Sequence, residues 1–294
     1  MMSKLKTYKV KRFKTWKSFK DYTDSFSENW IFRGQSDSTW DLNTSLERSG
    51  FSTKYDGIES SFFIEFRRTA ENFLKTKDIP NDLLEWLALM QHHGAPTRLL
   101  DFSKSIFVAS YFAFESIESK ATHIAIWAID INKVAQKSTE YLWPHFGESL
   151  KKNHGRLTDD LFERVFFERG YECLIPVEPY KMNQRYYLQQ SAFVSVGDSR
   201  IPFMEQLTFL DSNIDDIIIK MVLPKSMTHE VITDLNKMNI NRASLFPDLD
   251  GYAKSLKMKY AVMKTMDGRI DEVIKEQEKI HGYKTVKNPI PKLR

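Results

Sequence analysis

The chain has 294 residues, of which 41% are hydrophobic and 13% aromatic, so it is long and apolar enough to bury a core of its own. This composition excludes a disordered chain and a small module held together by disulfides. No run of about 18 uncharged apolar residues occurs, and no apolar segment follows the basic N-terminus, so we expect a soluble, cytoplasmic protein without a membrane span. The single cysteine, Cys173, permits no internal disulfide and by itself builds no metal site.

Charge is unevenly distributed along the chain. The net charge is +4, but residues 1–20 carry +8, residues 254–294 carry +6, and the body between them carries −10. Basic ends can hold nucleic acid, a membrane surface or an acidic protein partner, or they can be solvated tails. We expect a basic N-terminal segment at 1–20, one main domain at 21–257 and a basic C-terminal extension at 258–294.

Hydrophobic periodicity predicts helices and strands in no regular alternation. The helical period occurs at 58–75, 81–93, 105–117 and 226–238, with a charged helix candidate at 269–279. Runs rich in β-branched and aromatic residues predict strands at 30–35, 122–130, 172–177 and 215–223. Because a βαβ rhythm and a G-x-G-x-x-G turn are missing, the pattern favours an α+β fold with a mixed, mainly antiparallel sheet packed with helices.

Three residues mark the expected helix ends. Pro80 suits the first turn of the second helix, and Gly94 suits a left-handed cap at its end. Ser226 can cap the helix that runs to Met238. The helix at 105–117 is apolar nearly all round, so we expect it at the centre of the fold.

The first polar cluster, Arg33, Gly34 and Gln35, stands at the end of the strand predicted at 30–35. A glycine there lets another backbone or a ligand come close. The Arg33 guanidinium can clamp a phosphate or carboxylate, or it can tie two loops together through backbone carbonyls. The sequence leaves both roles open.

The densest polar cluster, residues 91–103, lies between two apolar helices. Arg98 and Asp101, three residues apart, can form an internal pair that orients the segment. His92 and His93 point about 100° apart on a helix end and cannot both ligate one metal. Since no H-x-x-x-H or H-E-x-x-H pattern occurs, we expect no metal site. One of the histidines can act as an acid, a base or a ligand donor.

In the third polar cluster, 185–193, aromatic residues stand beside Arg185, Gln189 and Gln190. The glutamines can hydrogen-bond a ligand that stacks on a ring, or they can satisfy neighbouring strand edges. Farther on, 245–251 contains Asp-Leu-Asp-Gly, which lacks the rest of a calcium loop and which we interpret as a structural turn.

Together these segments resemble the FRG domain family, which is named for an aromatic-Arg-Gly motif. The resemblance extends from about residue 16 to about residue 256. Four ordered motifs carry it: FRGQSDSTWDLNTSLER at Phe32–Arg48, LALMQHHGAPTRLLDFSKSIFVASYFAFE at Leu87–Glu115, RYYLQQSAFVSV at Arg185–Val196 and SLFPDLDG at Ser244–Gly251. Two residues depart from the family, which commonly has Gly in place of Ser191 and Trp in place of Phe102.

The resemblance implies a bacterial or phage protein linked to antiviral defence or toxin systems, and a distant relation to ADP-ribosyltransferases. Under that relation Arg33 and Arg98 bind the phosphates of NAD, Tyr111 stacks in the nicotinamide pocket, and Gln190 orients the ribose hydroxyl. The expected site comprises catalytic Arg33, Asp101 and Gln190 and ligand-binding Gln35, His92, His93, Thr97, Arg98, Tyr111 and Arg185. It takes NAD as substrate and no metal.

Three functions follow as expectations. The first is cleavage of NAD or a related nucleotide with transfer of ADP-ribose to a macromolecule or water. Gln190 stabilises positive charge less than a carboxylate does, so Glu172, Glu178 or Asp101 can supply that charge instead. The second is a non-catalytic module that senses a nucleotide, nucleic acid or phage protein. The third is a hydrolase or nuclease acting through His92 or His93 with Asp101. An antitoxin or a phage trigger is a candidate partner.

Overall fold

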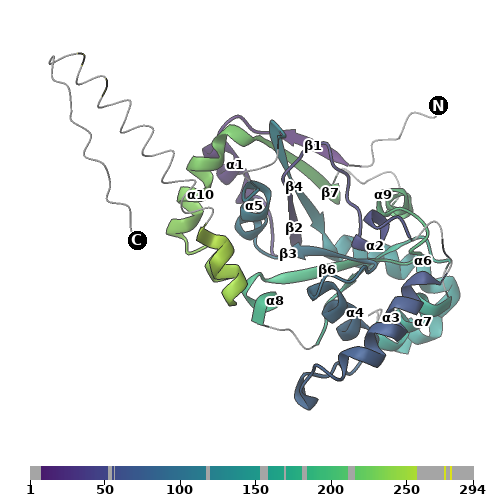
Figure 1. Cartoon of the computed structure of the whole chain (residues 1–294). Coiled ribbons are helices and arrows are strands. Elements are labelled where there is room, and N and C mark those ends of the chain that lie inside the picture. Colours follow the sequence, from purple (N-terminus) through teal and green to yellow (C-terminus); the bar gives the residue numbers. More distant parts are fainter. Residues whose placement is uncertain are drawn as a thin grey trace.

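The computed structural model describes residues 8–256 except 52–54, 56, 117–119, 153–157, 169, 181–183 and 211–215, together with residues 275 and 279. The strands of this part form a seven-stranded sheet in the order β1-β7-β4-β2-β3-β6-β5 (Figure 1). Among the described strands β1 and β7 pair in parallel, and the other neighbours pair antiparallel. The predicted α+β class with a mixed, mainly antiparallel sheet is confirmed.

The described elements have the following bounds. The strands are β1 (Lys9–Arg12), β2 (Trp30–Gln35), β3 (Leu99–Ser103), β4 (His123–Asp130), β5 (Leu174–Val177), β6 (Ser191–Val196) and β7 (Ile218–Pro224). The longer helices are α1 (Trp16–Thr23), α3 (Ile58–Ala70), α4 (Leu83–His92), α5 (Ile106–Phe114), α6 (Ile131–Lys152), α7 (Asp159–Glu168) and α10 (Thr228–Lys237). The short ones are α2 (Ser45–Arg48), η1 (Thr76–Asp78), α8 (Gln184–Leu188), α9 (Phe203–Gln206), η2 (Leu207–Leu210), η4 (Lys225–Met227) and α11 (Arg242–Leu245), and residues 249–256 are also helical.

None of the described helices has the length and apolar character that crossing a bilayer requires.

The sheet consists of two halves that meet at one residue pair. Strands β1, β7, β4 and β2 form one half, and β3, β6 and β5 form the other. Between β2 and β3 the register holds Phe32 opposite Ser103 and no further pair, whereas every residue of β2 pairs with β4. The two halves therefore separate immediately beyond this pair.

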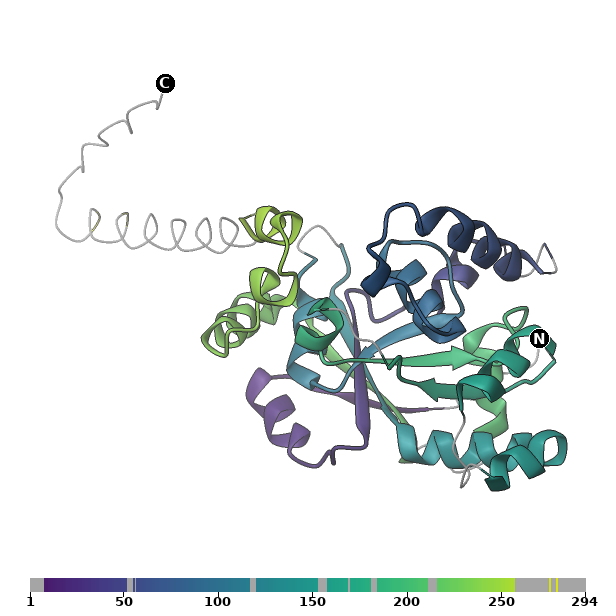
Figure 2. The ribbon, with the colours of Figure 1, turned by 90° about the horizontal axis from the view of Figure 1, so that it is seen from below.

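Successive side chains of a strand point to opposite faces of the sheet and pack into different hydrophobic clusters. On β4, Ile126 packs with α5, α1 and α10, whereas Trp127 points to the opposite face and packs with Val134 of α6. A further cluster joins α3, α4 and α7 to the half-sheet of β3, β6 and β5. Figure 2 shows helices on both sides of the sheet. Seven of the nine residues of α5 are buried, as the sequence predicts.

The predicted helix ends are in part correct. Gly94 follows α4 with a φ of 84°, so its role as a left-handed cap is confirmed. The helix itself begins after Asp82, whose side chain accepts a hydrogen bond from the Glu85 backbone, and not at Pro80. The prediction that Ser226 caps α10 is wrong, because a turn of 3-10 helix precedes α10 and no side chain caps it.

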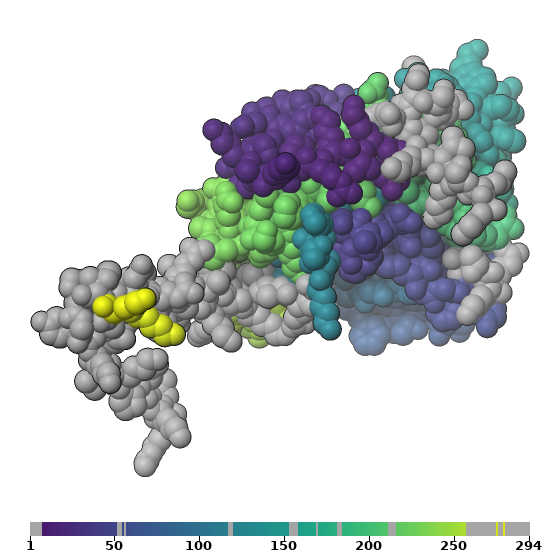
Figure 3. Space-filling view, turned by 90° about the horizontal axis from the view of Figure 1, so that it is seen from above, coloured from purple at the N-terminus to yellow at the C-terminus, as the bar shows by residue number. Residues whose placement is uncertain are grey.

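Residues 8–20 belong to the folded domain. Strand β1 pairs with β7, and Trp16 of α1 is buried. Trp16 Nε1 and Lys20 Nζ both donate to Asp234 of α10, at 2.8 and 2.7 Å, and the purple N-terminal residues lie against the green ones in Figure 3. The predicted boundary at residue 20 therefore falls inside α1. The predicted extension at 258–294, with its helix candidate, lies outside the described residues apart from 275 and 279.

Gly34 is the point of close approach between α5 and β2. A Cβ atom at residue 34 would lie 1.9 Å from the carbonyl oxygen of Ala109 and 2.6 Å from the backbone nitrogen of Ala113. These distances leave no room for any side chain. Packing of the central helix against the sheet therefore explains the glycine that follows Arg33.

We predict that Gly34→Ala lowers the free energy of unfolding by about 1–3 kcal/mol or more, because strand or helix must shift to admit the methyl group. Gly147→Ala is the matched control, since a Cβ there first meets the half-exposed Trp143 side chain, at 3.3 Å. Urea unfolding followed by circular dichroism measures both variants. Equal stability of the two would contradict the packing argument.

Candidate functional site

A pocket of about 630 Å³ opens where β2 and β3 separate. Its volume is in the range of sites for small ligands. The walls come from β2 and β3, the loop between β2 and α2, the side of α5, the end of α4, and α8. The split in the sheet thus places side chains from both half-sheets around one cavity.

Arg33 spans the gap between the half-sheets. Its Nη1 donates to the backbone carbonyl of Asp101 at 2.7 Å and lies 3.9 Å from the carboxylate of the same residue. The ladder between β2 and β3 ends at the Phe32–Ser103 pair. The Arg33 guanidinium therefore supplies the hydrogen bond that the Asp101 carbonyl would receive from the backbone if the ladder continued. Burial lowers the pKa of Arg33, and Asp101 opposes this shift. Of the two roles left open by the sequence, the tie to a backbone carbonyl is present.

Three buried nitrogens around the pocket have no hydrogen-bond partner among the described residues: Arg33 Nε, His92 Nδ1 and Arg185 Nε. Such groups are almost always paired in folded proteins, because an unpaired one loses its hydration without compensation. Arginine nitrogens only donate, so they require acceptors. The pocket therefore holds two arginine nitrogens that lack an acceptor and one histidine nitrogen that lacks a partner.

Charged side chains of both signs line the pocket: Arg33, Arg48, Arg185, Asp41, Asp101 and Glu115. The Glu115 carboxylate accepts from Arg242 Nη1 at 2.7 Å, and Asp101 lies beside Arg33. Asp41 acts electrostatically on the buried Lys220. Neither Arg48 nor Arg185 forms an ion pair within the described part of the chain. Each lining carboxylate thus has a cation nearby, whereas Arg48 and Arg185 contact the carbonyl of Asn43 and the ring of Phe246 and no described carboxylate at ion-pair distance.

His92 stands at the end of α4 and faces the pocket. Burial lowers the pKa of His92, and the positive charge of Arg185 and the neighbouring His93 lower it further, whereas Asp248 opposes the shift. The free protein therefore holds His92 neutral near pH 7. An anion in the pocket would favour the charged imidazolium and raise this pKa.

We predict that inorganic sulfate, which keeps its charge over this range, binds the pocket more tightly as the pH falls from about 8 to 5.5, by up to roughly tenfold. The sign follows from linkage: the bound anion raises the pKa of His92, so binding takes up a proton. Calorimetric titrations across this range measure the affinity. An equal pH dependence in His92→Gln would assign the proton to another group.

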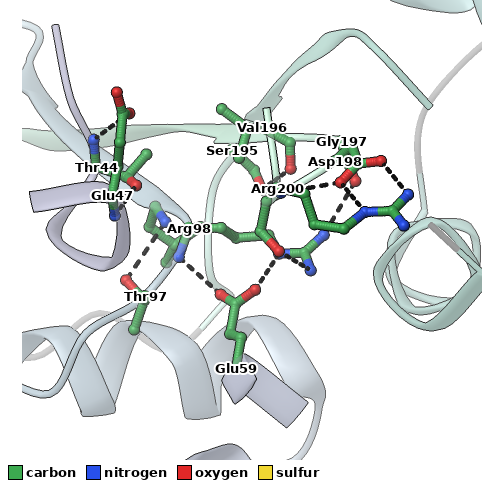
Figure 4. A network of polar contacts seen from close by, with 12 residues as sticks. Thr44, Glu47, Glu59, Thr97, Arg98, Ser195, Val196, Gly197, Asp198 and Arg200 are labelled. Atoms are coloured by element: carbon green, nitrogen blue, oxygen red, sulfur yellow. Dashed lines mark hydrogen bonds and ion pairs between the residues drawn. The ribbon is translucent and has the colours of Figure 1, made fainter. Parts of the chain in front are cut away.

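Arg98 lies in a buried network outside the pocket lining (Figure 4). Its side chain is 2% exposed, Nε donates to Glu59 at 2.7 Å, and Nη1 donates to the carbonyl of Gly197 at 3.1 Å. The prediction that Arg98 binds phosphates is therefore not supported. Nor does Arg98 pair with Asp101, because residues three apart in extended chain point to opposite sides. The network instead ties α3 to the start of β3 and the end of β6.

We predict that Glu59→Ala destabilises the protein by about 3–5 kcal/mol, because the Arg98 charge is left buried without its partner. Glu65→Ala, on an exposed face of the same helix, serves as the control, and we expect a change within about 0.5 kcal/mol. Chemical unfolding of both variants gives the comparison. A small effect of Glu59→Ala would mean that water replaces the carboxylate.

Two further predicted residues support the walls of the pocket. The Thr97 hydroxyl donates to the side chain of Gln91, which lines the pocket. Gln35 also lines it, but its amide donates to the carbonyl of Asp41 at 2.9 Å and accepts from Trp127 Nε1 at 2.7 Å. Both ends of Gln35 are thus engaged within the protein. We conclude that Thr97 and Gln35 position the loop and the helix end around the cavity.

Tyr111 and His93 lie outside the pocket lining. Tyr111 is 2% exposed on α5, and its hydroxyl is engaged with Glu115, so its ring offers no face to a ligand. His93 caps α4 and is exposed. Of the histidines predicted to work with Asp101, only His92 therefore shares the pocket with it. No group of three or more His, Cys, Asp or Glu side chains with metal-binding geometry occurs among the described residues.

The paired glutamines have opposite environments. Gln190 is exposed, has a φ of 49° and does not line the pocket. Gln189 lines it, and its amide donates to the carbonyl of Leu245 at 3.1 Å. Of the two glutamines, Gln189 and not the predicted Gln190 therefore belongs to the pocket lining. Glu172 and Glu178, the alternative carboxylates, are also exposed and outside the lining.

Sequence reasoning missed several residues of the site: Trp40, Arg48, Phe112 and Glu115. Trp40 and Arg48 stand in the same motif as Arg33, and Glu115 ends the motif that contains Asp101. Membership of those motifs is the signal that would have found them. Gln189 was considered together with Gln190, but nothing in the sequence indicates which of the two glutamines lines the pocket.

Residues 28–122, about a third of the chain, match the family model of the FRG domain. The chain carries an FRG domain. The match covers the motifs at Phe32–Arg48 and Leu87–Glu115, and the two later motifs lie beyond it. No curated protein and no solved structure matches the chain. The FRG segment supplies β2, β3, α4 and α5 to the pocket, whereas Arg185 and Gln189 of the same pocket come from the chain after it.

Proposed function

We propose that the pocket binds NAD or a related nucleotide and that the protein cleaves its glycosidic bond. The observation that carries the proposal is the set of unpartnered nitrogens of Arg33, His92 and Arg185 in one pocket that also holds Arg48. Guanidinium groups bind phosphate oxygens in bidentate fashion, and a dinucleotide presents two adjacent phosphates to them. A pocket of about 630 Å³ has room for a nucleotide of this size.

Cleavage requires stabilisation of a positive charge on the ribose. The bond between ribose C1′ and the nicotinamide nitrogen breaks, the electron pair leaves with nicotinamide, and C1′ becomes cationic. We assign the stabilising carboxylate to Asp101, which lines the pocket and is 50% exposed. Glu115 suits this role less, because Arg242 and Tyr111 already bond to it. Water or an acceptor hydroxyl then attacks C1′ and loses its proton to solvent.

A non-catalytic sensor of a nucleotide is the second candidate. The observation that favours it is the position of Gln190 outside the pocket, which leaves the ribose without the contact expected of a transferase. Such a module would use the same arginines for the phosphates and would bind without turnover. The two candidates therefore share a ligand and differ in whether nicotinamide is released.

We predict that millimolar NAD or ADP-ribose raises the melting temperature of the wild-type protein, since a ligand at 100 times its Kd stabilises by about 2.7 kcal/mol. Arg33→Ala and Arg48→Ala should abolish the shift. Arg48 is the safer variant for folding, because its side chain is exposed. Arg67→Ala removes an exposed arginine of α3 outside the pocket, and this variant should still show the rise in melting temperature.

Nicotinamide release, followed in the same samples, separates the two candidates. Release by the wild type and its loss in Asp101→Asn would support cleavage. A shift without release would favour the sensor. The absence of any shift with either ligand would overturn nucleotide binding.

We extend the cleavage proposal to the cell. An enzyme that consumes NAD would be toxic to a bacterium, in keeping with the defence and toxin roles that the FRG resemblance implies. Controlled expression in a bacterial host should lower NAD and arrest growth, and Asp101→Asn should restore both. If Asp101→Asn still arrests growth, the toxicity does not come from cleavage of NAD. An antitoxin or a phage trigger would then be sought among suppressors of the arrest.

A further inference from the structure

Trp40 is an exposed aromatic residue of the pocket lining. Its side chain is 52% exposed, and the residue belongs to the pocket lining. The other exposed large hydrophobic side chains of the described chain, such as Phe73 and Trp143, lie outside the lining. The indole also makes no ring contact with any described residue. About half of the surface of Trp40 is therefore open to solvent, at a residue that lines the pocket.

The backbone that carries this ring is held firmly in place. The carbonyl of Trp40 accepts from Lys220 Nζ at 3.1 Å, and its nitrogen donates to the carbonyl of Asp37 at 3.3 Å. Lys220 is itself buried, and its ammonium lies 4.5 Å from the ring of Trp127. Two residues on, Leu42 is fully buried in the core. The exposure of the indole is thus a property of a fixed loop.

A large ring exposed on a fixed backbone forgoes the free energy of burying its apolar surface. The other aromatic residues of the lining are already engaged. Phe32 and Phe102 are buried in the core, Phe112 makes edge contacts with Tyr111 and Phe246, and Tyr186 makes an edge contact with Phe193. Among the aromatic lining residues of the described chain, Trp40 is therefore the one whose side chain is exposed.

We propose that the Trp40 indole is the platform on which the aromatic base of the nucleotide stacks while its phosphates lie on the pocket arginines. This inference rests on the proposed function and adds a requirement on the ligand. A phosphate compound without a flat ring uses only part of the site. Stacking tolerates different bases, because every base has a π face, so Trp40 selects for an aromatic ring and not for one base.

The test compares ADP-ribose with inorganic pyrophosphate, which has the phosphates and no base, by calorimetric titration of the full chain. Trp40→Ala should weaken ADP-ribose binding roughly fivefold to a hundredfold, as loss of one stacking partner does. Its affinity for pyrophosphate should stay as in the wild type. Trp40→Phe, which keeps a ring, should restore most of the ADP-ribose affinity. Trp143→Ala, which removes a 49% exposed indole on α6, should bind both ligands as the wild type does.

The other outcomes overturn the inference in distinguishable ways. Unchanged ADP-ribose binding in Trp40→Ala would remove Trp40 from the site and leave the nucleotide proposal intact. An equal loss for both ligands would assign Trp40 to the shape of the loop. A wild type that binds pyrophosphate as tightly as ADP-ribose would exclude a base subsite. A wild type that binds neither would overturn the inference and the proposed function together.

Discussion

The separation of β2 from β3 is the constraint on which the rest of the site depends. An antiparallel ladder that stops after Phe32 and Ser103 leaves carbonyls and amides facing a gap, and buried groups of this kind need partners. Arg33 supplies one through its contact with the carbonyl of Asp101. A charged side chain thereby closes the sheet where the backbone does not. The same geometry leaves Arg33 Nε beside the cavity, so that one residue both holds the half-sheets together and faces a ligand.

The cavity keeps its shape because separate contacts hold its walls from different sides. Close packing at Gly34 sets α5 against β2, and the buried pair of Arg98 with Glu59 anchors the start of β3 to α3. On the other side, Lys220 holds the loop that carries Trp40. A ligand cannot reach any of these contacts. Each contact nevertheless fixes the position of a residue that lines the pocket. Some polar residues of the motifs, such as Arg98, therefore hold the walls of the pocket in place and do not line it.

Much of the fold could be predicted from local pattern. β2 has the bounds expected from its apolar run, and α5 is buried because it is apolar nearly all round. The α+β class followed from the missing βαβ rhythm. β3 was not predicted as a strand, because Leu99–Ser103 mixes polar and apolar residues and becomes a strand only through its pairing with β6. Segments whose structure depends on a distant partner give no local signal.

For the candidate site, the sequence by itself determined which short segments gather there: the FRG segment with Arg33 and the polar segment with His92 and Asp101. Polar side chains inside apolar surroundings are costly unless they have partners or a ligand, so their presence is informative without a structure. Only the tertiary structure decided which residues these side chains bond to and which of them line the pocket. Arg98 bonds to Glu59, 39 residues away, and Gln189, which lines the pocket, bonds to Leu245, 56 residues away. Contacts between distant residues and the direction of one side chain arise only when the whole chain is folded.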